Sequence, residues 1–242
     1  MTATAAAPPE RPAQRSAPHW WQRPWILPLA LFSATFLAYA LPPYLGLDPA
    51  QARVTVPEGV AWYYPLLVIH IFGGSLLTLL VILQVWPWLR ARRPAVHRWS
   101  GRVYVLAGIP LVGVPGLLIA PFSHFGTSVQ ISNVIWALLW LSFTVIGYRM
   151  ARRRRFALHR EWMLRSFALI YGIAFSRVLT VVLVMASLPR LESEYGGDAE
   201  ALGLAIAPTN AFLSWIVPLL LVEWWLKYRR PRGRRSRTAA TA

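Results

Sequence analysis

Residues 63–88 read YYPLLVIHIFGGSLLTLLVILQVWPW and contain no Asp, Glu, Lys or Arg. An α-helix of this length reaches about 39 Å at 1.5 Å per residue, which exceeds the roughly 30 Å hydrocarbon core of a bilayer. Backbone groups inside lipid must be hydrogen-bonded within the protein, and a single apolar segment achieves this only as a helix. The stretch therefore predicts a transmembrane helix.

Five further apolar stretches are of comparable length, at about 25–45, 103–122, 130–150, 163–188 and 209–227. Together with 63–88 they predict an all-α, polytopic membrane bundle of six transmembrane helices over residues 25–228. The segments 1–24 and 229–242 are rich in Pro, Ala or Arg and poor in large apolar residues, which predicts disorder. One alternative stays open, because Ala38-Tyr39-Ala40 imitates a signal-peptide cleavage site and cleavage would leave five helices.

The basic residues predict the orientation of the chain. Arg and Lys gather before the first stretch and after the second, fourth and sixth, whereas most acidic residues, such as Glu192 and Asp198, lie in the other loops. Cytoplasmic loops carry the excess of Lys and Arg. We therefore expect both termini in the cytoplasm and the chain in the cytoplasmic (inner) membrane of a bacterium.

The composition excludes several classes of function. Hydrophobic residues make up 56% of the 242 residues and charged residues 14%, which is untypical of a soluble domain. The net charge of +16 does not indicate nucleic-acid binding, because the basic residues lie between apolar runs. The expected partners are the lipid bilayer and anionic lipid headgroups at the cytoplasmic arginine clusters. The absence of cysteine excludes thiolate metal sites, and no common catalytic motif is present, so the sequence leans against an enzyme.

Two basic segments resemble each other at an offset of 62 residues. Residues 90–98 (RARRPAVHR) and 152–160 (RRRRFALHR) share six of nine positions. With one inserted residue, the match continues through Trp99 and Trp162, Arg102 and Arg165, and Tyr104 and Phe167. This favours a parallel repeat of helical hairpins, built from helices two and three and helices four and five, with His97 facing His159 across an approximate two-fold axis. The alternative is that arginine-rich cytoplasmic turns simply resemble one another.

Arg177 marks the first candidate site, because a charged residue within a transmembrane helix usually faces the protein interior, a cavity or a ligand. It lies about 20 Å from the cytoplasmic start of the fifth helix. We place His70, Asn133 and Asn210 at nearly the same level, in the outer half of the membrane. Together the four side chains predict a site for an anionic or carbonyl-bearing ligand, as in a small transporter. The structural alternatives are that Arg177 bonds backbone carbonyls freed by Pro110 and Pro115 in the third helix, or that its side chain snorkels outward along its own stem.

The second candidate site is the pair of basic segments. Its residues are His97, Arg98, Arg102, His159, Arg160, Trp162 and Arg165. Imidazoles on different helices can hold a haem iron while arginines bind the propionates, so haem b is a candidate cofactor, with His97, His159 and His70 as candidate iron ligands. The alternative is that these side chains bind lipid headgroups.

Three motifs carry a resemblance to a known family. They are His-Ile-x-Gly-Gly at 70–74, His-Arg-x-x-Gly-Arg-x-Tyr at 97–104, and His-Arg-x-Trp-Met-x-Arg-Ser at 159–166, the last followed by Arg177. Together they resemble a bacterial family of predicted membrane proteins known as domain of unknown function 2306, over about residues 63–188. The resemblance implies that His70, Arg102, His159, Trp162, Arg165 and Arg177 belong to one motif set, and it assigns no role to any of them.

Three classes of function follow, in order of preference. The first is a multi-pass membrane protein with a ligand-binding, partner or assembly role. The second is a small transporter with an anion site at Arg177 and His70. The third is a haem-binding or quinone-linked membrane redox protein.

Overall fold

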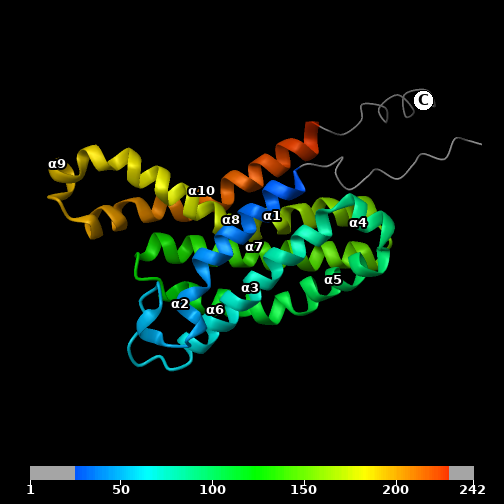
Figure 1. Cartoon of the computed structure of the whole chain (residues 1–242), viewed down its shortest axis with the longest axis horizontal. Coiled ribbons are helices and arrows are strands. Elements are labelled where there is room, and N and C mark those ends of the chain that lie inside the picture. The colour runs from blue at the N-terminus through cyan, green and yellow to red at the C-terminus, as the bar shows by residue number, and fades with distance from the viewer. Residues whose placement is uncertain (1–24, 229–242) are drawn as a thin grey trace, which may run out of the picture.

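A computed structural model describes residues 25–228, and all secondary structure within this range is helical. The all-α prediction is confirmed, whereas the predictions for 1–24 and 229–242 lie outside the described residues. Figure 1 shows helices that run between two ends of a bundle. We call the end with α4 (Pro87–Arg92) and the α7–α8 turn at 153–155 the basic end, and the end with α2 (Pro42–Leu45) the distal end.

Five helical segments of the described chain are long and apolar enough to cross a membrane, as the sequence predicts for the second to the sixth stretch. They are α3 (Tyr63–Val85), the run from α5 to η4 (Pro94–Phe122), α7 (Thr127–Arg152), the run from α8 to α9 (Phe156–Tyr195) and α10 (Ala199–Tyr228). The first predicted stretch forms α1 (Ile26–Ala40), whose 15 residues make it shorter than the others.

The third stretch is a discontinuous helix. It consists of α5 (Pro94–Leu106), a π-helical turn η3 (Ile109–Gly113), α6 (Val114–Ile119) and a 3₁₀ turn η4 (Ala120–Phe122). Pro110 and Pro115 explain the break, because neither can donate a backbone N–H to the helical ladder. Within η3 the register shifts, and Val114 donates its N–H to Ile109.

Two helices begin well before the apolar stretches that predicted them. α8 (Phe156–Ser187) includes the polar segment before residue 163, and α10 starts at Ala199 and continues through Pro208. α8 is followed by η5 (Leu188–Arg190) and α9 (Leu191–Tyr195), and η2 (Pro49–Gln51) lies between α2 and α3. The residues added at the start of α8 are of mixed polarity, whereas those added at the start of α10 are mainly apolar.

A buried polar network joins α5, α7 and α8 at the centre of the bundle. The Tyr104 hydroxyl lies 2.8 Å from Ser166 Oγ, which lies 2.7 Å from Thr144 Oγ1. Trp140 donates its indole N–H to the Tyr104 hydroxyl over 3.1 Å. All four side chains are buried, so this network satisfies polar groups that would otherwise be costly inside a membrane protein.

Small residues allow α8 to approach its neighbours closely. Ala168, Gly172 and Ser176 are all buried along one side of α8. A Cβ at Gly172 would lie 2.7 Å from Cζ2 of Trp136 in α7 and 2.9 Å from the backbone oxygen of Ser214 in α10. Position 172 therefore has no room for a side chain.

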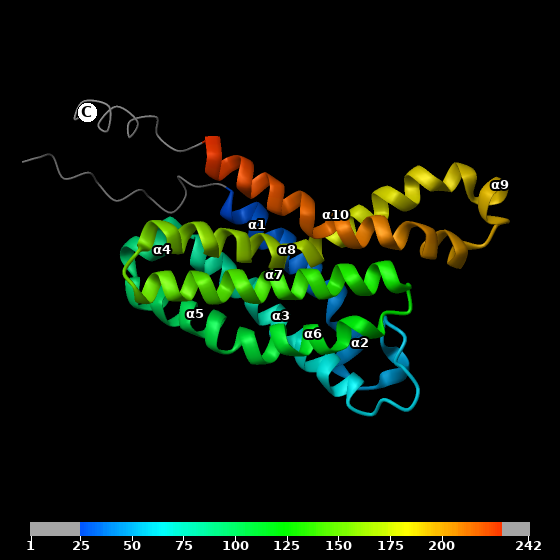
Figure 2. The ribbon, with the colours of Figure 1, turned by 180° about the vertical axis from the view of Figure 1, so that it is seen from behind.

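Beyond the distal ends of the other spans, α8 and α10 continue as a separate helical hairpin. Both views show this hairpin, with α9 at its tip, standing away from the rest of the bundle (Figures 1 and 2). We call residues 181–209 the distal arm.

Candidate functional site

His97 and His159 lie near each other at the basic end, in the first turns of α5 and α8. Each is seven residues, and hence about two helical turns, from a member of the buried network, Tyr104 in α5 and Ser166 in α8. Those two residues are hydrogen-bonded, so the faces that carry the histidines converge. Both imidazoles are half-buried, and they are close enough to interact electrostatically.

The two imidazoles differ in their hydrogen bonds. His159 Nδ1 lies 2.9 Å from the carbonyl oxygen of Gly147. A carbonyl only accepts, so Nδ1 carries the proton and Nε2 of a neutral His159 keeps a lone pair. In contrast, Nδ1 of His97 is buried and has no hydrogen-bond partner among the described residues. The His97 ring is therefore the one polar group of this pair that still lacks a partner.

Exposed arginines surround the pair. They comprise Arg90, Arg92, Arg93, Arg98 and Arg102 on one hairpin and Arg149, Arg152, Arg153, Arg154, Arg155 and Arg160 on the other. The carboxylates at this end of the described chain are Glu161 and Glu223, far fewer than the guanidinium groups. The basic end therefore has a positive potential that favours anionic ligands.

The Arg165 guanidinium forms an ion pair that the sequence did not reveal. Its Nε and Nη2 donate to the two carboxylate oxygens of Glu223 in α10, the second over 2.9 Å. Arg165 also lies 4.8 Å from the ring of Trp162, and Arg160 lies 5.2 Å from the ring of Trp225 in α10. Three of the predicted ligand residues thus make contacts within the protein, and two of them connect α8 to α10.

Arg98 and Arg102 are different, because both are exposed and neither makes a side-chain hydrogen bond or ion pair with a described residue. Both guanidinium groups therefore lack a partner within the described residues.

The structure does not bring His70 to Arg177. His70 Nδ1 lies 2.9 Å from the carbonyl oxygen of Val112 in the π-helical turn, and its ring packs where a Cβ of Gly116 would be. It is thus His70, and not Arg177, that bonds a carbonyl of the broken helix. The broken helix packs on α7 near Trp140. One turn away in α7, Trp136 donates its indole N–H to the backbone oxygen of Leu169 in α8, so the broken helix and Leu169 lie at a similar height along the bundle. Arg177 lies eight residues further along α8, or about 12 Å.

Arg177 is exposed and makes no hydrogen bond or ion pair with a described residue. Near it, Asn210 donates its side-chain amide to Thr180 Oγ1 over 3.0 Å, while Asn210 Oδ1 is buried without a partner in the described chain. Asn133 is half-buried and makes no side-chain hydrogen bond with a described residue. Arg177, Asn133 and Asn210 therefore lie at a similar level on packed helices, but no hydrogen bond in the described residues joins one of these side chains to another.

His70 also lies far from the other two predicted iron ligands. Gln84 donates to the backbone oxygen of His97 over 2.8 Å and follows His70 by 14 residues in α3, or about 21 Å. His70 therefore cannot share one bound ion with His97 and His159. No group of three or more His, Cys, Asp or Glu that could hold a metal occurs within residues 25–228.

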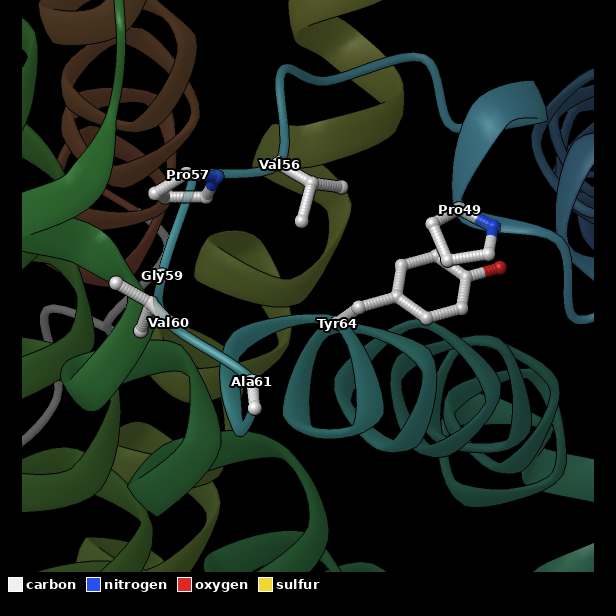
Figure 3. A pocket seen from close by; sticks show the side chains of 7 residues that line it. All are labelled: Pro49, Val56, Pro57, Gly59, Val60, Ala61 and Tyr64. Carbon is white, nitrogen blue, oxygen red and sulfur yellow. The ribbon is translucent and has the colours of Figure 1, made fainter.

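A pocket of about 330 Å³ opens at the distal end, between the segment before α3 and α3 itself (Figure 3). Its lining consists of Pro49, Val56, Pro57, Gly59, Val60, Ala61 and Tyr64. This lining contains no charged side chain and none of the predicted site residues. The pocket therefore does not fit an anionic ligand.

Comparison with known proteins identifies the family. No curated protein and no solved structure gives a significant match to the chain. The model of a family described as "Predicted membrane protein (DUF2306)" matches residues 67–225, a range that includes His70, both basic segments, Arg177 and Glu223. Because this match covers more than half of the chain and agrees with the resemblance seen in the motifs, the protein belongs to the DUF2306 family of predicted membrane proteins.

Proposed function

We propose that this chain is a membrane-embedded binding protein that takes an anionic, phosphate-bearing ligand at its basic end, between the starts of α5 and α8. The observation that carries the proposal is the convergence of His97 and His159 among exposed arginines whose charge the described carboxylates do not balance. The phosphate can belong to a lipid headgroup or to a soluble ester.

The residues at this end suit a phosphate group. Arg98 and Arg102 offer planar guanidinium groups that can each donate two hydrogen bonds to phosphate oxygens. The unpartnered His97 ring adds a donor once the ring turns toward the ligand. The first-turn N–H groups of α5 and α8 lie at the same end and add the positive ends of two helix dipoles.

Lipid binding to the full-length protein tests this proposal. Native mass spectrometry would compare phosphatidylglycerol with phosphatidylcholine, and glycerol 3-phosphate would serve as the soluble probe. We expect phosphatidylglycerol to bind more tightly, with an affinity that falls as salt rises. Binding of glycerol 3-phosphate would identify a soluble ester as the source of the phosphate. Equal binding of the two lipids, without binding of the soluble probe, would overturn the proposal.

The variant Arg98→Gln/Arg102→Gln supplies the matched comparison. Neither side chain bonds a described residue, so the variant should fold normally, yet phosphatidylglycerol should bind about tenfold more weakly. Arg53→Gln is the control, since Arg53 is an arginine near the distal end, where it bonds the Tyr39 carbonyl. Unchanged binding in the double variant would contradict the assignment of these arginines.

Haem binding is a second candidate, favoured by one specific observation. A metal-bound histidine usually donates its other ring N–H to a carbonyl or carboxylate, and His159 does so to Gly147. The interior beside the pair is filled by Tyr104 and Phe167, so a porphyrin would fit only toward the surface of α5 and α8. A Soret band in the purified protein, with sharp bands after dithionite reduction, would support haem, and a colourless protein expressed with ample haem would exclude it. We do not extend the proposal to transport, because His70 and Arg177 lie at different levels.

We also propose six crossings with both termini in the cytoplasm of a bacterial inner membrane. α1 supports the first crossing, because Leu41 keeps helical dihedral angles and α2 follows, so the helical path from Ile26 to Leu45 reaches about 30 Å with a bend at Pro42. The chain has no native cysteine, so single cysteines can report the topology. An impermeant maleimide should label Glu58→Cys in intact spheroplasts and Arg93→Cys only after permeabilisation, and the reverse pattern would overturn the orientation.

We further infer that the α3–α5 and α7–α8 hairpins are repeats of one unit. The repeat aligns Tyr104 with Phe167, and these rings meet edge to face with centroids 5.1 Å apart. Equivalent residues of a two-fold arrangement touch only near its axis, so this contact and the proximity of His97 to His159 support the repeat.

A further inference from the structure

The distal arm begins where the other spans end. Four contacts link the first turns of α3 and α7 to α8 at a similar height along the bundle. They are Trp62 with Phe122 (ring centroids 5.2 Å apart), Gln130 with the Ser123 oxygen (2.9 Å), Ser132 with the Ala211 oxygen (2.9 Å) and Asn210 with Thr180 (3.0 Å). Thr180 therefore lies at about the level of those first turns, with Arg177 one turn inside it. Figures 1 and 2 agree that the arm extends beyond this level.

One side of the arm is apolar and uncovered. Val181, Val182, Met185 and Leu188 are 62%, 56%, 63% and 44% exposed. Arg177 precedes Val181 by four residues and Met185 by eight, so it lies on the same helix face. An exposed and unpaired arginine thus stands at the base of an apolar stripe.

Lipid alone cannot satisfy this surface. If the hydrocarbon ends at the first turns of α3 and α7, the stripe stands in water, where a contiguous apolar surface indicates a protein interface. If the hydrocarbon instead reaches the tip of the arm, Arg177 lies about 16 Å inside it without a counter-charge, which is costly. A helix that covers the stripe and carries a carboxylate beside Arg177 satisfies both requirements.

We propose that the distal arm docks a transmembrane helix of a different protein, and that a carboxylate of this helix pairs with Arg177. A second copy of the chain does not fit this surface, because like charges would face each other. A symmetric dimer with its axis along the membrane normal would place Arg177 opposite Arg177 and would bring the acidic tips, with Glu192 and Asp198, together. This inference is independent of the phosphate site proposed at the basic end.

A synthetic helix can test the interface. The probe is a leucine-rich transmembrane peptide with lysines at its distal end and one Glu about 11 residues, or 16 Å, inward, and its control has Gln at that position. The full-length protein in nanodiscs carries a donor fluorophore on Ser193→Cys at the tip of the arm, and the peptide carries the acceptor. We expect the Glu peptide to bind about tenfold more tightly than the Gln peptide, and Arg177→Gln to abolish this preference.

Competition separates docking from random mixing. Excess unlabelled Glu peptide should reduce the energy transfer to that of random mixing, whereas excess unlabelled Gln peptide should reduce it less. Equal binding of the two peptides, or an unchanged preference in Arg177→Gln, would overturn the proposal. Energy transfer between donor- and acceptor-labelled copies of the chain at Ser193→Cys would overturn it in favour of a second copy.

Discussion

The substitution Gly172→Ala tests how the bundle is packed. The added Cβ would lie 2.7 Å from Trp136 Cζ2 and 2.9 Å from the Ser214 oxygen. Neither neighbour can retreat easily, because the Trp136 indole is hydrogen-bonded to the Leu169 oxygen and the Ser214 oxygen belongs to the backbone. Pro218 lacks the N–H that would ordinarily bond this oxygen, so α10 brings a free carbonyl close to α8.

The magnitude follows from two opposing effects. Replacing a helical glycine by alanine favours the helix by roughly 0.5–1 kcal/mol. Crowding of a filled core costs about 1–3 kcal/mol. We therefore expect a net loss of up to about 2.5 kcal/mol in the free energy of unfolding and a correspondingly lower melting temperature.

Gly74→Ala is the matched control, because Gly74 also lies within a membrane-crossing helix and its Cβ would meet no atom within 4 Å. This variant should keep the full helix gain and be more stable than the wild type by about 0.5–1 kcal/mol. Unfolding of both variants in detergent, followed by circular dichroism, measures the difference. A Gly172→Ala protein as stable as Gly74→Ala would refute the close approach of α8 to its neighbours.

Three further substitutions can be measured in the same unfolding assay. Glu223→Gln removes the ion-pair partner of Arg165; the Arg165 side chain is 16% exposed and the Glu223 side chain 44%. We expect the free energy of unfolding to fall by roughly 1–2 kcal/mol, and Arg165→Gln in the same chain to restore part of this loss. Tyr104→Phe leaves buried polar neighbours unpaired and should cost about 1–3 kcal/mol, and a neutral result would show that the hydroxyl network adds no stability. Gly116→Ala places a Cβ 2.8 Å from His70 Cε1 and should cost about 1–3 kcal/mol, which His70→Ala should relieve if this contact is the cause.

The helices could be predicted from the sequence because lipid leaves an apolar segment no alternative to a helix. Their ends could not, because polar sequence outside the hydrocarbon is free to continue the helix or to leave it. From the sequence we expect residues 199–208 to form a loop, because they contain Glu200, Gly203 and Pro208. In the structure these residues are helical and belong to α10, which packs along α8. Tertiary contacts, which the local sequence does not record, decided this boundary.

The candidate sites divide in the same way. The proximity of His97 and His159 could be predicted, because two similar segments of one hairpin repeat imply similar positions. The pairing of Arg165 with Glu223 could not be predicted. α10 has no distinct polar face, so its sequence does not indicate which side turns toward α8.

Under the proposed repeat, two prolines account for the main difference between the hairpins. Pro110 and Pro115 align with Ile173 and Val178, at the spacing that also aligns Tyr104 with Phe167. In the first hairpin the prolines break the returning helix, which ends at η4 near the distal end. In the second hairpin Ile173 and Val178 keep the helical hydrogen bonds, so α8 runs on to Ser187 and forms one side of the distal arm. His70 bonds the Val112 oxygen within this broken helix, so the first hairpin has an inward histidine and the second has an extended arm.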